Sequence, residues 1–103
     1  MSVSIMLCTA PEDEARSLSD RLLEQRLVAC VNLVGPIESR YRWEGAIEVG
    51  RETLMVIKTA SERTAEVRDR LLEWHSYDTP EVLELGVASG AARYLDWVLA
   101  STR

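Results

Sequence analysis

The most constraining feature of this sequence is the order of its hydrophobic patterns. Two units, each a helical segment flanked by apolar runs, are joined by a pair of long extended runs. Short apolar runs indicate buried strands, and apolar residues spaced three or four apart indicate helices. Strict alternation indicates a strand with one exposed face. We expect strands at 3–9, 28–34 continuing to 44, 46–59 and 81–87, and helices within 9–28, 59–75 and 91–103.

This order predicts the fold class. A chain of 103 residues suffices for one ordinary domain and is too short for two. The order strand–helix–strand–strand–helix–strand is that of the ferredoxin-like motif. We therefore expect a single α+β domain over residues 1–103. It is a ferredoxin-like sandwich with a long hairpin between the second and third strands and a C-terminal helix.

Local signals suggest where the elements begin and turn. Thr9 with Glu12, and Thr59 with Glu62, have the spacing of capping boxes at the starts of the first two helices. The Gly-Pro pair at 35–36 predicts a bend or bulge in the second strand. The Glu-Gly pair at 44–45 predicts the hairpin turn.

The topology decides which distant residues can meet. In this motif the third strand fills the gap between the first two, and the fourth strand pairs with the free side of the first. Cys8 then lies at the same end of the sheet as His75, which follows the second helix. Cys30 lies at the opposite end. The fold can bring the sole imidazole close to one thiol, but should not bring the two cysteines together.

Composition excludes several classes of function. The net charge of −5 and the pI of about 4.9 argue against a nucleic-acid partner and against an anionic membrane surface. We expect no signal peptide, and no apolar run in the sequence is long enough to span a membrane. Its two cysteines form no CxxC pair and no zinc pattern. We expect a reduced, cytoplasmic protein.

The residues around His75 leave several chemical roles open. A thiolate and an imidazole suit copper or zinc, and Asp78 and Glu81 could add oxygen ligands. Equally, a histidine at a helix end can interact with the helix dipole, and a cysteine in an apolar strand can be a small buried hydrophobe. A nucleophilic role for Cys8 has no evident third group or oxyanion hole.

Four aromatic residues have unusual positions. Tyr41 and Trp43 lie on the expected hairpin arm, and Tyr94 and Trp97 lie on the last helix. Exposed aromatic side chains on an arm favour a protein contact. The alternative is that the last helix covers the arm within the same chain.

Six short motifs, in this order and spacing, resemble the CutA divalent-cation tolerance family. They are "LCTAP" (7–11), "QRLVACVN" (25–32), "YRWEG" (41–45), "IKT" (57–59), "HSYDTPE" (75–81) and "YLDW" (94–97). The resemblance covers nearly the whole chain. It implies a ferredoxin-like protomer in a tight homotrimer similar to the PII signalling proteins, a link to tolerance of divalent metals, copper above all, and no enzymatic reaction.

The resemblance also implies site residues. In some copper-binding members the ligands are a cysteine and a histidine that match Cys8 and His75. The family usually has proline after that histidine, and Ser76 here predicts a less firmly held His75. Some members place a second histidine where this chain has Trp74.

We therefore expect a homotrimeric protein that binds a divalent metal ion, copper first and zinc second, and acts in metal tolerance. The expected metal ligands are Cys8, His75, Asp78 and Glu81, and the residues expected to line an inter-subunit cleft are Tyr41, Trp43, Glu44, Lys58 and Tyr77. The alternatives are a PII-like signalling module that binds a small effector and an unknown protein partner, an enzyme that uses Cys8, and a purely structural role.

Overall fold

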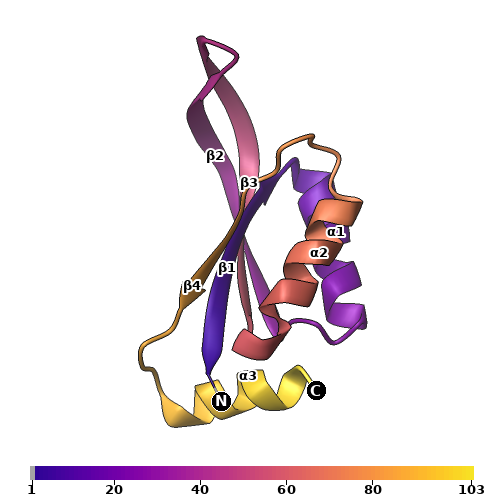
Figure 1. Ribbon diagram of the computed structural model, residues 1–103, viewed down its shortest axis with the longest axis vertical. Helices are drawn as coiled ribbons and strands as arrows, with labels where there is room; N and C mark the ends of the chain where they lie inside the picture. The colour runs from indigo at the N-terminus through magenta and orange to yellow at the C-terminus, as the bar shows by residue number, and fades with distance from the viewer. Residues whose placement is uncertain (1) are drawn as a thin grey trace.

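The protein is described by a computed structural model covering residues 2–103. Its elements follow in the order β1 (Val3–Ala10), α1 (Glu12–Glu24), β2 (Cys30–Trp43), β3 (Ala46–Ala60), η1 (Ser61–Arg63), α2 (Thr64–Trp74), β4 (Val82–Gly86) and α3 (Ala92–Ser101). The strands form one sheet in the order β2-β3-β1-β4, and every neighbouring pair is antiparallel. The predicted ferredoxin-like α+β topology is confirmed (Figure 1).

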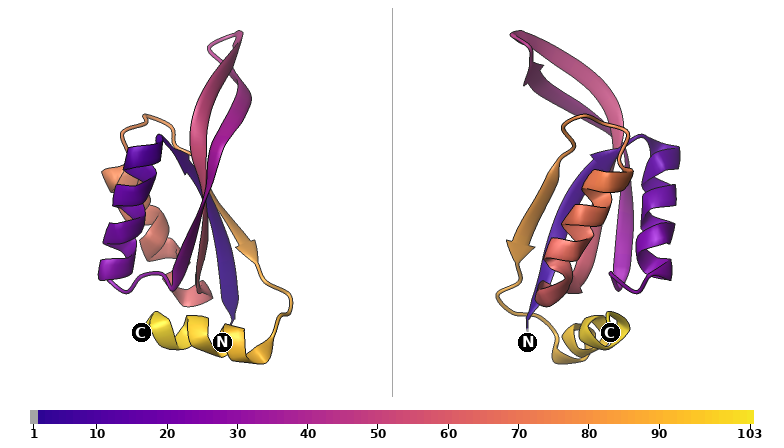
Figure 2. Two further views of the ribbon diagram at one scale, coloured as in Figure 1. Left: turned by 180° about the vertical axis from the view of Figure 1, so that it is seen from behind. Right: turned by 45° about the vertical axis from the view of Figure 1, so that its right-hand side comes forward.

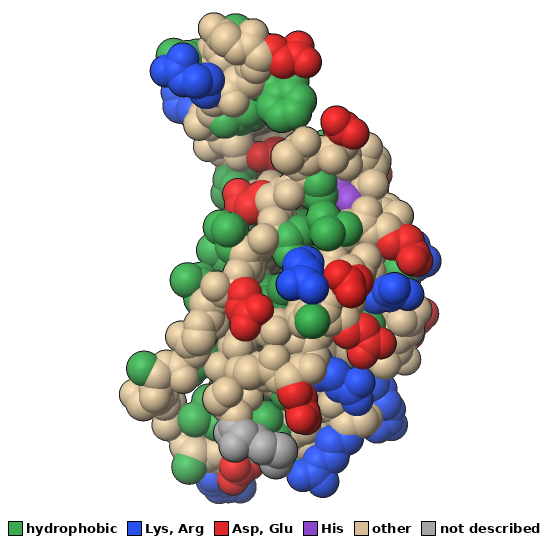
Figure 3. Space-filling model, viewed as in Figure 1, with side chains coloured by type: hydrophobic (Ala, Val, Ile, Leu, Met, Phe, Trp, Pro, Cys, Tyr) green, Lys and Arg blue, Asp and Glu red, His purple; other side chains and the backbone are tan. Residues whose placement is uncertain are grey.

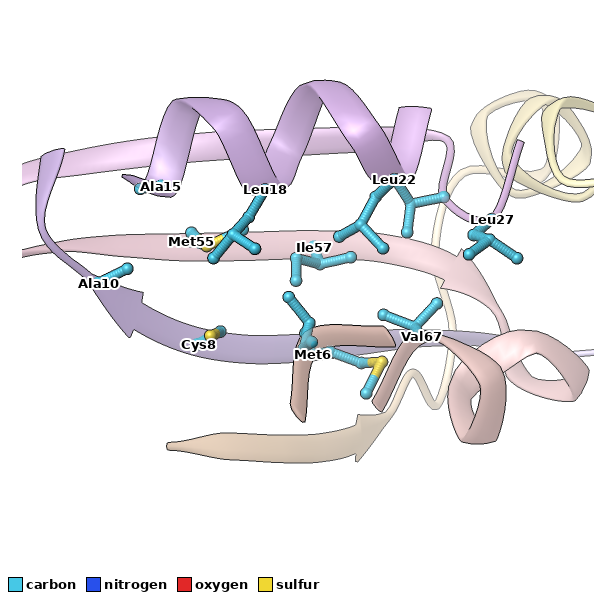
Figure 4. Close-up of a cluster of buried hydrophobic side chains, with 12 residues drawn as sticks. Met6, Cys8, Ala10, Ala15, Leu18, Leu22, Leu27, Met55, Ile57 and Val67 are labelled. Atoms are coloured by element: carbon cyan, nitrogen blue, oxygen red, sulfur yellow. The ribbon is translucent and has the colours of Figure 1, made fainter. Parts of the chain in front are cut away.

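Helices α1 and α2 cover one face of the sheet (Figures 1 and 2). The apolar positions of α1 and α2 pack on the side chains that β1 and β3 direct to this face. Figure 4 shows the members of this core. They are Met6, Cys8, Ala10, Ala15, Leu18, Leu22, Leu27, Val28, Met55, Ile57, Val67 and Leu71. Trp74 packs against this core only partly buried, with the Arg21 guanidinium 3.8 Å from its ring centroid.

The other face of the sheet is also apolar but has no helices over it along most of its length. Strand alternation places Ile5 and Leu7 on this face, and their partners across the ladders are Leu85 and Leu83 of β4. Leu83 and Leu85 are 53% and 51% exposed. Leu54 and Val56 of β3 lie on the same face. We call these six residues the open face.

Strands β2 and β3 continue past the body of the protein as a long arm (Figure 2). The ladder between them shifts register between Val34 and Ile37, so the predicted bulge at Gly35-Pro36 is confirmed. The turn at the tip has Glu44 and Gly45 at φ values of 49° and 81°. Positive φ at both central residues is typical of a tight two-residue hairpin turn, as the Glu-Gly pair predicted.

Both predicted capping boxes are wrong. Thr9 and Thr59 belong to strands β1 and β3, and no side chain caps α1, η1 or α2. The ladder between β1 and β3 continues to Ala10, so Thr9 is held in extended backbone. The hydroxyl of Thr59 donates instead to the carbonyl of Leu27 at 2.6 Å.

Helix α3 crosses the end of the sheet opposite the hairpin tip (Figure 1). Tyr94 and Trp97 lie against each other, with ring centroids 5.6 Å apart, and both remain exposed. The helix therefore does not cover Tyr41 and Trp43 within the chain, and that alternative is wrong. None of the helices among residues 2–103 is long and apolar enough to cross a bilayer.

Candidate functional site

Three segments meet at the end of the sheet from which the arm projects. Strand β1 finishes there, α2 ends at Trp74, and the connection from His75 to β4 passes over this end before Val82 pairs with Cys8. Cys8 and His75 are thus brought to the same end, while Cys30 pairs with Lys58 towards the other. Both cysteines are free thiols. This is the arrangement that the topology predicted.

His75 is held at both ring nitrogens. Its side chain is 0% exposed. Nε2 lies 2.8 Å from the carbonyl oxygen of Thr9, and Nδ1 lies 3.1 Å from the backbone nitrogen of Tyr77. Because a carbonyl only accepts and a backbone N–H only donates, these bonds select the neutral imidazole with its proton on Nε2. Neither nitrogen has a spare lone pair for a metal ion in this arrangement.

Cys8 approaches the same carbonyl from strand β1. Its Sγ lies 3.8 Å from the Thr9 oxygen and the residue is 0% exposed. Burial raises the pKa of the thiol to about 12, and the charges of Glu81, Glu14 and Glu52 add to the effect. The thiol is therefore protonated at neutral pH, and thiolate chemistry or metal ligation requires a change in its surroundings.

Glu14 and Ser76, which the sequence did not single out as site residues, fix the start of the connection. The Ser76 backbone N–H and hydroxyl donate to the two Glu14 carboxylate oxygens at 2.8 and 2.5 Å. Glu14 Oε2 also lies 3.3 Å from His75 Nδ1. The expectation that Ser76 would leave His75 loosely held is wrong, since proline could supply neither donor. In the sequence, the only sign of the contact with Glu14 was a serine, rather than a proline, directly after His75.

The pKa of Glu14 is lowered in the folded protein. Its partial burial acts in the opposite direction, but the two hydrogen bonds from Ser76 and the electrostatic interaction with the nearby His75 ring outweigh it. The carboxylate therefore stays ionised near His75, and the connection to β4 is anchored to helix α1.

A groove of about 760 Å³ separates the arm from this connection. Figure 3 shows the hollow below the arm, bordered by hydrophobic and acidic side chains. Its lining includes five of the residues that the sequence singled out: Tyr41, Trp43, Tyr77, Asp78 and Glu81.

Two of the residues predicted to line the cleft, Glu44 and Lys58, lie outside this groove. Glu44 occupies the tip turn outside the groove. Lys58 is six positions along β3 from the groove residue Glu52, roughly 20 Å away at the rise of an extended strand. Its side chain belongs to the same side of the sheet as the open face. Within one chain these two residues therefore do not line the groove.

The described residues do not contain a preformed closed metal site. Among residues 2–103, no group of three or more His, Cys, Asp and Glu side chains converges to hold a metal ion. Asp78 and Glu81 are exposed on the connection, whereas Cys8 and His75 are buried behind it. The sequence could place these residues at one end of the sheet but could not determine their convergence.

Comparison with known proteins agrees with the fold and the motifs. The family model described as "CutA1 divalent ion tolerance protein" matches residues 4–101. The chain belongs to this family. A divalent-cation tolerance protein CutA from Archaeoglobus fulgidus is 46% identical over 91 residues, which are 87% of this chain and 88% of that protein.

Solved structures of the CutA family match almost the full chain. The divalent cation tolerance protein from Thermus thermophilus has a TM-score of 0.94 and 36% identity, covering 98% of this chain and 99% of that one. A protein described as PII-like CutA from Nostoc sp. PCC 7120 has a TM-score of 0.92 and 28% identity, with 97% of each chain covered. The family is one of divalent-cation tolerance and is not an enzyme family.

Proposed function

We propose that this chain is a homotrimeric protein that binds divalent cations, copper first and zinc second, in the response to metal ions. The observation that carries the proposal is the approach of the Cys8 thiol and the His75 imidazole to the same Thr9 carbonyl, in a family of divalent-cation tolerance. Sulfur and imidazole nitrogen are ligands that copper and zinc prefer.

Binding of a metal ion at Cys8 and His75 requires the loss of a hydrogen bond and of a proton. His75 must exchange its bond with Thr9 or with Tyr77 for a metal ion, and Cys8 must lose a proton. Metal affinity should therefore increase with pH, because protons compete with the metal ion for the sulfur. Asp78 and Glu81 supply accessible carboxylates on the connection that covers the pair.

The test is a copper titration under reducing and non-reducing conditions. The variants are Cys8→Ser and His75→Ala, with Cys30→Ser as the matched thiol control at the other end of the sheet. Stoichiometric binding should be lost in the first two variants and retained in Cys30→Ser. A thiolate-to-copper charge-transfer band should appear in the wild type and in Cys30→Ser, and should be absent from Cys8→Ser. Equal weak binding in all four proteins would refute the proposed ligands.

Self-association is part of the proposal, and the open face supports it. The open face is a contiguous apolar surface on strands β1, β3 and β4, and Leu83 and Leu85 on it are about half exposed, which favours burial against another protein surface. The trimer is the assembly that the family resemblance implies.

We place the protein in the cytoplasm, where its two unpaired thiols would stay reduced. Cell fractionation tests this location.

A PII-like signalling role is the second candidate. The observation that favours it is the groove, because a concave site with aromatic walls and a few polar groups is typical of small-molecule binding. A ligand that binds only the folded protein should raise its melting temperature. A screen of small molecules by thermal shift therefore tests this function separately from copper binding.

A further inference from the structure

The groove has an aromatic lining that a bare metal ion does not need. Tyr41, Trp43 and Tyr77 line it and are 48%, 44% and 37% exposed. Tyr41 and Trp43 share one face of β2, and Tyr77 comes from the connection opposite. The His75 ring lies 4.6 Å from the Tyr77 ring, centroid to centroid, and helps to fix it. The aromatic surfaces thus come from both walls.

A glycine leaves space beside the aromatic residues of the arm. Gly50 pairs with Ser39 in the ladder, next to Tyr41 on the same face of β2. The Tyr41 hydroxyl would be 3.9 Å from a Cβ atom at Gly50, an ordinary contact distance. A longer side chain there would project into the groove, so Gly50 keeps this part of it accessible.

The charges in the groove favour a positive ligand. Three carboxylates line it, those of Glu52, Asp78 and Glu81. Two guanidinium groups, those of Arg40 and Arg51, also belong to the lining, so three negative groups face two positive ones. The Arg40 guanidinium is 3.1 Å from the Glu38 carboxylate, which neutralises part of its charge. The carboxylates do not converge to hold a metal ion among the described residues. A ligand that interacts with all three carboxylates at once must therefore be larger than a bare metal ion.

We propose that the groove binds a small organic cation, an ammonium compound whose charged group lies against the faces of Trp43 and Tyr77 and near the carboxylates of Glu52 and Glu81. Aromatic faces attract cations through the negative potential of their π-systems, and the attraction strengthens when water is excluded. This inference rests on the small-effector function proposed above and names the chemical class of the effector.

Choline is the probe, because its uncharged analogue dimethylbutanol has carbon in place of the ammonium nitrogen and nearly the same shape. Calorimetric titration of the intact assembled protein should show binding of choline and at least roughly tenfold weaker binding of dimethylbutanol. Trp43→Leu and Glu52→Gln should each weaken choline binding by several-fold. Trp97→Leu, at an equally exposed tryptophan on α3, and Glu44→Gln, at the hairpin tip, should not.

The outcomes separate this inference from the function on which it rests. Equal binding of choline and dimethylbutanol would show an apolar site and overturn the cationic class. Binding of anionic or neutral compounds through Trp43, without choline, would overturn the cationic class and retain the effector function. A screen in which no small molecule of any charge binds or raises the melting temperature would overturn both.

Discussion

Glu14 joins two parts of the chain that are far apart in sequence. Its carboxylate accepts two hydrogen bonds from Ser76, 62 positions later, and lies beside the buried His75. Hydrogen bonds to a charged group contribute more than neutral ones, and the Glu14 side chain is only 22% exposed. This single residue therefore holds the connection that covers Cys8 and borders the groove.

Replacing Glu14 by glutamine should destabilise the protein in a pH-dependent way. Because the pKa of Glu14 is lowered from 4.5 by folding, its ionisation stabilises the folded state above that value, and the contribution is lost as pH falls through the lowered pKa. We expect Glu14→Gln to cost about 1 kcal/mol at neutral pH and less at about pH 3. Urea unfolding at the two pH values measures both differences.

Glu12→Gln is the matched control for that experiment. Glu12 lies in the same first turn of α1 but is 63% exposed, and its contact with Arg16 is long at 3.9 Å. Such exposed pairs contribute little to stability. The interpretation of Glu14 is refuted if the two variants are equally stable, or if the Glu14→Gln difference does not decrease in acid.

The sequence predicted part of the site at the residue scale. Element order alone placed Cys8 and His75 at one end of the sheet. It could not show that the Thr9 carbonyl and the Tyr77 N–H occupy the ring nitrogens of His75, because those contacts depend on the conformation of one loop. The Glu14–Ser76 contact depends on how α1 and α2 sit relative to each other, which no local pattern encodes.

At the scale of elements, strand pairing overrode local helix signals. The spacing of Thr9 and Thr59 fits capping boxes, yet both residues have ladder partners, Leu54 and Ser4, in the pairing of β1 with β3. Strand and hairpin boundaries were more predictable, because proline restricts the backbone and glycine permits the positive φ that a tight turn requires. The bulge at Gly35-Pro36 and the turn at Glu44-Gly45 are examples.

Gly35 is a sensitive position in the arm. A Cβ atom there would lie 2.9 Å from Thr53 Oγ1 and 3.3 Å from Thr53 Cα, and Thr53 is buried. We expect Gly35→Ala to destabilise the protein by about 1–3 kcal/mol through overpacking at the bulge. Thermal or urea unfolding measures the loss.

Two further variants make the Gly35 result interpretable. Thr53→Ala removes the hydroxyl that clashes, so Gly35→Ala should cost less stability in the Thr53→Ala background than in the wild type. Gly86→Ala, where a Cβ atom would have no neighbour within 4 Å, should be nearly neutral. A neutral Gly35→Ala would show that the bulge can shift to accept the methyl group.

At the scale of the whole molecule, the fold leaves one face of its sheet without helices. This bare face follows from the ferredoxin-like motif, because both of its helices pack on the same side of the sheet. The sequence identified the aromatic residues of the arm and of α3. It could not show that these two sets lie at opposite ends of one chain (Figure 1), where they cannot cover each other.

The account depends above all on the open face being covered by further copies of the chain. Leu85 on the open face and Leu72 on α2 are both 51% exposed, so they form a matched pair. If copies meet on the open face, a charge at Leu85 is buried and unpaired in the assembly, whereas a charge at Leu72 stays in water. Neither substitution should prevent a single chain from folding.

The decisive measurement is the mass in solution, by light scattering, of the wild type, Leu85→Lys and Leu72→Lys. We predict about three times the chain mass of 11.6 kDa for the wild type and for Leu72→Lys, and a smaller mass for Leu85→Lys with unchanged circular dichroism. A wild-type mass near 11.6 kDa, or equal masses for the two variants, would contradict the proposed assembly.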